Sequence, residues 1–200
     1  MIGLFSNYLR QQRFKAVVPY VKGDVLDLGC GLANILSYLP SNQVYVGIER
    51  HPYMFKWLLE NRNGYEFHQK NLDQDTLSLD RLFDTILMSA VIEHMKHPQN
   101  ILRQVPELLK PGGRLLLTTP SQFGASIHNI GAKAGLFSKD AADEHETIFS
   151  LATLQSLLNE NGLKVDFYRK FLWGGNQIFK PAWHYGSSSK VKLPCSPKKA

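Results

Sequence analysis

The sequence contains few cysteines and no long apolar run. Only two of its 200 residues are cysteines, Cys30 and Cys195, which is too few for a disulfide framework or a thiolate metal cluster. No segment has enough consecutive apolar residues to span a bilayer. The N-terminus lacks the basic start and continuous apolar stretch of a secretory signal. These absences predict a cytoplasmic protein without a transmembrane segment.

Acidic residues are outnumbered by basic ones, and the formal net charge is +6. Part of this excess lies near the C-terminus, at Lys190, Lys192, Lys198 and Lys199. Together with the local Ser and Pro content, it predicts a solvated basic tail over 186–200 instead of a nucleic-acid surface. The remaining residues, 1–185, have the size and composition of a single globular domain without repeats.

Strand-like apolar runs alternate with helix-like stretches along the chain. We expect strands at 24–28, 44–48, 65–68, 83–88 and 114–118, and helices from Asn34, from Pro52 and through 101–109. Lys-Pro-Gly-Gly at 110–113 should separate the last of these helices sharply from the strand after it. Repeated strand-helix units predict an α/β fold with a doubly wound, mostly parallel, Rossmann-like sheet.

Three segments add to this core. Residues 5–20 are loosely amphipathic, which predicts an N-terminal lid helix. Residues 120–148 are too long and irregular for a simple connection and are interpreted as a functional loop. After a helix at 151–161, runs at 164–172 and 176–179 are joined by Gly174-Gly175, which predicts a hairpin with an antiparallel final strand.

A glycine-rich turn follows the first predicted strand. Residues 25–31 are Val-Leu-Asp-Leu-Gly-Cys-Gly, and such glycines let the backbone approach a ligand in front of the next helix. This pattern indicates a nucleotide-like ligand. A turn also uses glycine for its dihedral angles alone, so the pattern needs support.

Two acids indicate which ligand this is. Asp27 ends an apolar strand, where a buried charge is costly unless it meets a partner. A carboxylate there would repel a dinucleotide diphosphate, whereas S-adenosylmethionine offers an ammonium and a sulfonium group. Glu49 ends the second strand, where an acid can accept hydrogen bonds from both ribose hydroxyls, although it could also be a solvated strand end. Together they predict S-adenosylmethionine as the cofactor.

With these motifs the chain resembles the class I S-adenosylmethionine-dependent methyltransferases over roughly residues 20–180. The resemblance implies that Asp27 faces the methionyl amine, that the loop of Gly29, Cys30 and Gly31 packs on the methionyl part and ribose, and that Glu49 takes the ribose hydroxyls. It also implies that Asn71 and Leu72 hold the adenine, although Asp73 lies close by in the alignment. Ser89 completes the predicted cofactor set.

Residues 89–94, Ser-Ala-Val-Ile-Glu-His, follow the fourth strand and resemble the Glu-His signature of this family. Methyl transfer needs a base only when the acceptor has a proton to lose. His94 is the predicted base, Glu93 a second catalytic candidate and His145 a third, ranked above His128. Each of them could instead cap a helix or hydrogen-bond a loop.

The acceptor is predicted only by class. Ala90 stands where some relatives place the first glutamate of a magnesium site, so we expect no metal. The segment after the fourth strand lacks the Asn/Asp-Pro-Pro-Tyr run that in relatives grips a planar amino group, which argues against a nucleic-acid acceptor. We therefore expect methyl transfer to a small-molecule or lipid-linked acceptor. The alternatives are an NAD-dependent oxidoreductase and a non-catalytic subunit with a cofactor-binding fold.

Overall fold

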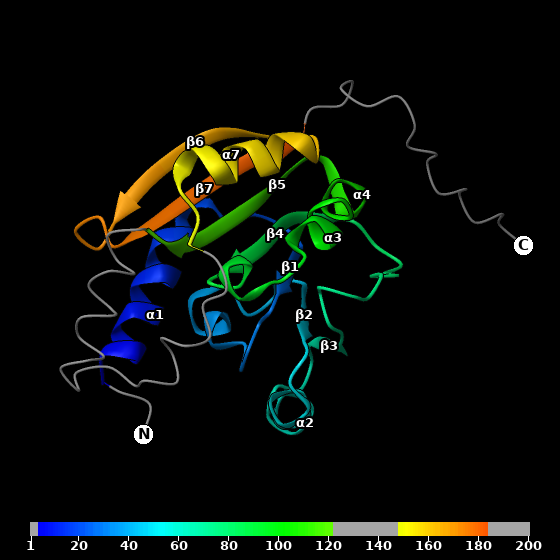
Figure 1. Cartoon of the computed structure of the whole chain (residues 1–200). Coiled ribbons are helices and arrows are strands. Elements are labelled where there is room, and N and C mark those ends of the chain that lie inside the picture. Colours follow the sequence, from blue (N-terminus) through cyan, green and yellow to red (C-terminus); the bar gives the residue numbers. More distant parts are fainter. Residues whose placement is uncertain (1–3, 122–147, 184–200) are drawn as a thin grey trace, which may run out of the picture.

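A computed structural model describes residues 4–121 and 148–183 of the chain (Figure 1). Two predicted segments fall mostly outside these ranges. Residues 122–147 contain most of the predicted loop with His128 and His145, and residues 184–200 contain the predicted basic tail. Those predictions are therefore not tested by the fold.

A seven-stranded sheet forms the centre of the protein, in the order β3-β2-β1-β4-β5-β7-β6. Strands β1 to β5 run parallel to one another, whereas β7 runs antiparallel to both of its neighbours, β5 and β6. The predicted α/β class, the parallel sheet and the antiparallel final strand are all confirmed. The strands are β1 (Val25–Leu28), β2 (Tyr45–Glu49), β3 (Glu66–Gln69), β4 (Phe83–Ser89), β5 (Leu109–Pro120), β6 (Leu163–Phe171) and β7 (Asn176–Trp183).

From β1 the chain adds β2 and β3 on one side of the sheet and then crosses back to place β4 on the other side of β1. The connections after β1 and after β4 therefore diverge between these two neighbouring strands. In open parallel sheets, ligands bind outside the carboxyl ends of the strands at such a point. The glycine-rich turn after β1 and the Glu-His segment after β4 both begin there.

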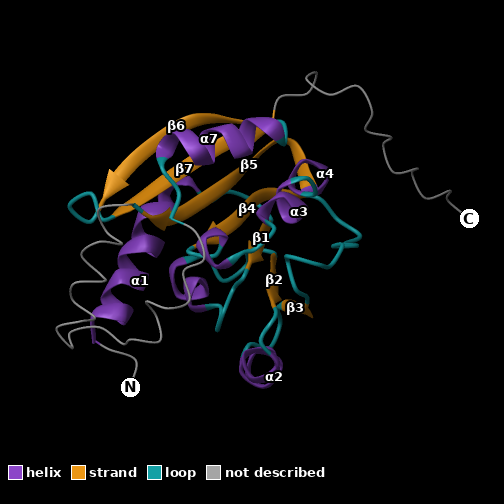
Figure 2. Cartoon of the chain, viewed as in Figure 1, coloured by secondary structure: helices purple, strands orange, loops and turns teal. Residues whose placement is uncertain are grey.

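Two apolar clusters cover the two faces of the sheet, because successive strand residues point to opposite sides. Leu87 and Leu116 belong to one cluster, whereas Ile86 and Leu115 belong to the other. The face of Leu87 is covered by α1 (Leu4–Val17), η2 (Asn34–Tyr38) and α2 (Pro52–Asn61). The opposite face is covered by α3 (Pro98–Leu102), α4 (Val105–Leu108) and α7 (Leu151–Glu160) (Figure 2).

Most helix predictions are confirmed in position. Helix α1 covers most of the predicted segment 5–20 and is followed by the short 3₁₀ helix η1 (Val18–Tyr20). Helix α7 begins where predicted and ends at Glu160, one residue before the predicted end, with Asn161 as its C-cap residue. Among the described residues, none of the helices combines the length and the apolar character that a membrane span requires.

Three expectations are wrong in detail. The helix from Asn34 is only a five-residue 3₁₀ helix, preceded by Ala33 in a left-handed conformation. The helix expected over 101–109 is divided, since α3 ends at Leu102 and Pro106 lies in the first turn of α4. Residues 110–113 lie within β5 and do not form a separate stop between a helix and that strand. The register of β5 with β4 is interrupted there.

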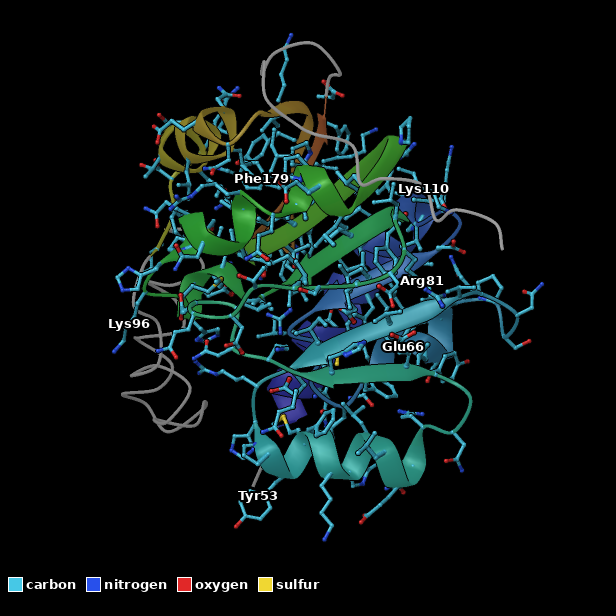
Figure 3. All side chains as sticks on the ribbon, turned by 90° about the vertical axis from the view of Figure 1, so that its right-hand side faces the viewer. Tyr53, Glu66, Arg81, Lys96, Lys110 and Phe179 are labelled. Atoms are coloured by element: carbon cyan, nitrogen blue, oxygen red, sulfur yellow. The ribbon has the colours of Figure 1, made fainter. Side chains whose placement is uncertain are left out.

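The amino-terminal edge of the sheet is held by an ion-pair cluster. Lys110 Nζ lies 2.7 Å from Asp24 Oδ2 and 2.8 Å from Asp84 Oδ2. Asp84 also accepts a hydrogen bond from the Asp24 backbone N–H. Figure 3 shows Lys110 well separated from Tyr53 on α2 and from Lys96. This cluster fixes the start of β1 at the end opposite the glycine-rich turn.

Candidate functional site

A cavity of about 300 Å³ lies at the carboxyl ends of β1, β2 and β4. Five of the residues predicted from the sequence line it: Gly29, Glu49, Asn71, Leu72 and His94. They come from four separate segments of the chain. The fold therefore gathers four of the predicted cofactor residues and the predicted base around one space, of a size typical for small-molecule sites.

The other predicted residues stand next to this space without lining it. Asp27, Cys30, Gly31, Ser89 and Glu93 belong to the same segments but are not part of the cavity wall. His145 lies outside the described residues. The described members of the predicted set thus fall into two groups, one at the cavity wall and one outside it.

Glu49 holds the glycine-rich turn in place. Its Oε2 accepts a 2.9 Å hydrogen bond from the Gly31 N–H, and its Oε1 accepts a 2.8 Å bond from the His51 N–H. The Ile48 carbonyl accepts the N–H groups of Gly29 and Cys30, each at 2.9 Å. A carboxylate has about four lone-pair sites, so Glu49 retains capacity for ligand hydroxyls. It therefore has a structural role whether or not it binds ribose.

Asp27 is buried, with 5% of its surface exposed. The Tyr45 hydroxyl donates a 2.7 Å hydrogen bond to Asp27 Oδ2. Burial raises the pKa of Asp27 to about 6, the Tyr45 hydrogen bond opposes this rise, and the nearby Glu49 charge adds to it. A carboxylate in this position is favourable only with a cation beside it, as the amino group of the predicted cofactor would provide.

Cys30 and Ser89 are predicted cofactor-binding residues that carry no charge. Burial and the charges of Asp27 and Glu49 raise the pKa of the Cys30 thiol far above its usual range, so it remains protonated and a poor nucleophile. Ser89 Oγ lies 3.2 Å from Thr118 Oγ1 on the neighbouring strand β5. Both residues support the shape of the site.

Asn71 and Asp73 form a compact turn at the cavity wall. Asn71 Oδ1 accepts a hydrogen bond from the Asp73 N–H at 3.1 Å, and Asp73 Oδ1 accepts one from the His97 N–H at 2.8 Å. Both side chains line the cavity together with Leu72. Either one could therefore receive the amino group of an adenine ring.

Glu93 and His94 lie in the 3₁₀ helix η3 (Ile92–His94) after β4. His94 is half-buried at the cavity wall, whereas Glu93 is buried with 2% of its surface exposed. Burial raises the pKa of Glu93, and the charges of His94 and Arg13 oppose this rise. Glu93 Oε2 receives no hydrogen bond from the described residues. Of the two, His94 is the one placed to meet a ligand in this cavity.

Several residues at or near the cavity were not found from the sequence. Tyr45 is one of them, and six further cavity residues are Arg50, Met54, Lys70, Val91, Met95 and Ala90. Arg50 and Lys70 directly follow β2 and β3, close to the predicted strand ends, and this position at the ligand-binding edge could have identified them. The apolar members carry no signal of their own, because Val and Met are ordinary core residues.

Comparison with known proteins gives a consistent family. A sequence model described as a methyltransferase domain matches residues 3–166. The mitochondrial ubiquinone biosynthesis O-methyltransferase of Mus musculus is 26% identical over 181 residues, which are 84% of this chain and 47% of that protein. The tRNA U34 carboxymethyltransferase of Desulfotalea psychrophila is 33% identical over 120 residues, which are 54% of this chain and 36% of that protein. The chain spans about half the length, or less, of these relatives.

Solved structures share the fold at low sequence identity. Magnesium protoporphyrin IX methyltransferase from Synechocystis PCC 6803, with bound S-adenosylhomocysteine, has a TM-score of 0.67 at 17% identity, covering 92% of this chain and 89% of that one. The glycopeptide N-methyltransferase MtfA with S-adenosylhomocysteine has a TM-score of 0.67 at 15% identity, covering 87% and 86%.

Proposed function

The chain belongs to the class I S-adenosylmethionine-dependent methyltransferase family, and we propose that it transfers a methyl group from S-adenosylmethionine to a hydroxyl of a small-molecule or lipid-linked acceptor. The observation that carries this proposal is that His94 lines the same cavity as Gly29 and Glu49. A proton-accepting side chain thus stands beside the predicted cofactor site.

The residues at the site fit the cofactor in charge and in shape. Asp27 is a buried carboxylate that, within residues 4–121 and 148–183, receives a single hydrogen bond, from a neutral phenol, and it has a second carboxylate nearby. An ammonium group would compensate this charge. A side-chain methyl on Gly31 would meet no atom within 4 Å, so open space faces this part of the turn. Asn71 and Asp73 supply acceptor oxygens for an adenine amino group.

S-adenosylmethionine supplies a methyl group already activated on a sulfonium sulfur. Held beside Asp27, Glu49 and the glycine-rich turn, it would give this methyl group to the acceptor oxygen and leave as S-adenosylhomocysteine. His94 accepts the hydroxyl proton and passes it to solvent. Asp27, Glu49 and the glycine-rich turn hold the donor, so that orientation supplies much of the acceleration.

The proposed hydroxyl acceptor is supported by the ubiquinone biosynthesis O-methyltransferase relative and can be tested directly. The protein and methyl-labelled S-adenosylmethionine would be incubated in separate reactions with a catechol, a polyprenylated catechol, a primary amine and transfer RNA. We expect label in a catechol and none in the amine. Label only in transfer RNA would replace this proposal with methylation of transfer RNA, the kind of substrate that the name of the carboxymethyltransferase relative gives.

His94→Gln should separate catalysis from cofactor binding. We expect kcat with a hydroxyl acceptor to fall by about 100-fold or more, because a positioned general base contributes roughly 10²- to 10⁴-fold. The affinity for S-adenosylhomocysteine should change by less than about threefold. His97→Gln is the control, since the His97 side chain is exposed and does not line the cavity. An unchanged kcat in His94→Gln would exclude His94 as the base.

A further inference from the structure

Tyr45 and Asp27 form a buried pair on adjacent strands. The register of β1 and β2 places Val25 opposite Tyr45 and Asp27 opposite Gly47, so Tyr45 and Asp27 are diagonal neighbours on one face of the sheet. The Tyr45 hydroxyl reaches Asp27 Oδ2 at 2.7 Å, and 2% of the Tyr45 surface is exposed. In the described ranges, Asp27 Oδ1 receives no hydrogen bond.

The groups that surround Asp27 in the described part of the chain do not include a cation. Because Gly47 has no side chain, the Phe67 ring and Cys30 Sγ occupy the position opposite Asp27, 2.7 and 2.8 Å from where a Gly47 Cβ would be. The titratable groups that act on this pair are Glu49 from the end of β2, Cys30 from the turn and Tyr45 itself. Two are neutral donors and one is an acid, so the residues that the structure describes leave the Asp27 charge uncompensated.

The Tyr45 ring is held by its own neighbours. It packs edge-on against Tyr65 at a centroid distance of 5.9 Å and against Phe67 at 6.2 Å. Burial and the adjacent Asp27 raise the pKa of Tyr45 well above its usual value, so the phenol keeps its proton. The hydroxyl is thereby fixed as a donor to Asp27 throughout the neutral pH range.

We propose that Tyr45 is a positioning residue of the cofactor site: its hydroxyl fixes one oxygen of the Asp27 carboxylate and leaves the other to receive the cofactor's ammonium group. This inference rests on the proposed cofactor binding and adds a residue to it. Tyr45 does not itself touch the cofactor. It acts by orienting Asp27 and by keeping it ionised.

The pair makes cofactor binding depend on pH in a defined direction. Only the ionised Asp27 attracts an ammonium, so affinity should fall as the pH decreases through about 6, the pKa of Asp27. The Tyr45 hydrogen bond lowers that pKa. Removing the hydroxyl should therefore move the loss of affinity to higher pH, by roughly one unit for a hydrogen bond to a charged group.

The test is calorimetric titration of the full chain with S-adenosylhomocysteine from about pH 5 to about pH 8. Tyr45→Phe should bind about fivefold to tenfold more weakly near pH 7, with its affinity profile displaced to higher pH. Tyr65→Phe is the matched control, because it also lies in the ring cluster but is not the residue bonded to Asp27. 5′-Methylthioadenosine, which lacks the amino acid part, should bind all three proteins without this pH dependence.

The outcomes separate this inference from the proposed function. If the wild type binds S-adenosylhomocysteine and the Tyr45→Phe profile superimposes on it, the positioning role is wrong while cofactor binding stands. A lower melting temperature in Tyr45→Phe with an undisplaced profile would likewise reduce Tyr45 to a packing residue. If the wild type binds nothing at any pH, the proposed function itself fails.

Discussion

Asp27→Asn is expected to weaken binding of S-adenosylhomocysteine by about 100-fold or more near pH 7. The substitution keeps the shape of the side chain and an acceptor for the Tyr45 hydroxyl, but it removes the charge that faces the ammonium. Losing one partner of a buried charge pair costs about 2 to 5 kcal/mol, and each 1.4 kcal/mol is about tenfold in affinity. Calorimetric titration of the variant and the wild type measures this loss.

Asp24→Asn is the matched control for this experiment. Asp24 lies just before β1, at the opposite edge of the sheet, where it pairs with Lys110. It should lose a surface ion pair worth about 1 kcal/mol or less and bind S-adenosylhomocysteine as the wild type does. Equal affinity losses in the two variants would mean that the Asp27 effect is not specific to the site.

The same Asp27→Asn variant should be more stable than the wild type without ligand. A carboxyl whose pKa is raised to about 6 by burial binds its proton more tightly in the folded protein. Its favourable contribution to folding is therefore complete below about pH 4 and is lost as the pH rises to about 6. At pH 7 this loss is up to about 3 kcal/mol, which the neutral Asn avoids. Urea unfolding of both proteins at about pH 4 and at pH 7 would measure this difference in stability. A variant that is less stable than the wild type at pH 7 would contradict the prediction.

Gly29→Ala is expected to destabilise the protein by about 3 kcal/mol. Gly29 has a φ of +73°, which costs a non-glycine residue about 1 kcal/mol or more, and an added Cβ would lie 2.6 Å from Val91 Cγ2. Overpacking of this kind costs about 1 to 3 kcal/mol. Because Val91 lies in the segment after β4, the clash would also separate the two parts of the site. Urea denaturation gives the change in stability.

Two further variants identify the cause of this loss. Val91→Ala leaves only its Cβ, 3.4 Å from the added methyl, so the double variant should recover part of the stability lost in Gly29→Ala. Gly31→Ala has a similar strain, with a φ of +55°, but no atom within 4 Å of its Cβ. It should therefore lose only about 1 kcal/mol. No recovery in the double variant would exclude Val91 as the source of the clash.

The sequence was informative where one residue type has a narrow physical meaning. An acid at the end of an apolar strand, two glycines after it and an acid at the next strand end are each unusual locally, and together they predicted one cavity. The alternation of apolar runs predicted the sheet because strands buried on both faces are continuously apolar. The division of the helix expected at 101–109 also has a sequence signal, which the prediction of one continuous helix did not use: Pro106 favours the first turn of a new helix.

The rest of the site depends on long-range geometry. Tyr45 meets Asp27 only through the register of β1 and β2, and a shift by one residue would turn it to the other face. The Asn71 and Asp73 side chains share one turn, so spacing alone could not choose between them. Val91 matters because it packs against Gly29, and Met54 because α2 brings it to the cavity. None of these contacts has a local sequence signal.

We propose that the cavity beside Asp27 and Glu49 holds S-adenosylmethionine, and a single calorimetric experiment decides this. The purified chain near pH 7.5 would be titrated with S-adenosylhomocysteine and, in parallel, with NADH. We expect saturable binding of one S-adenosylhomocysteine per chain and no binding of NADH. Binding of NADH without S-adenosylhomocysteine, or binding of neither, would overturn the proposed cofactor site.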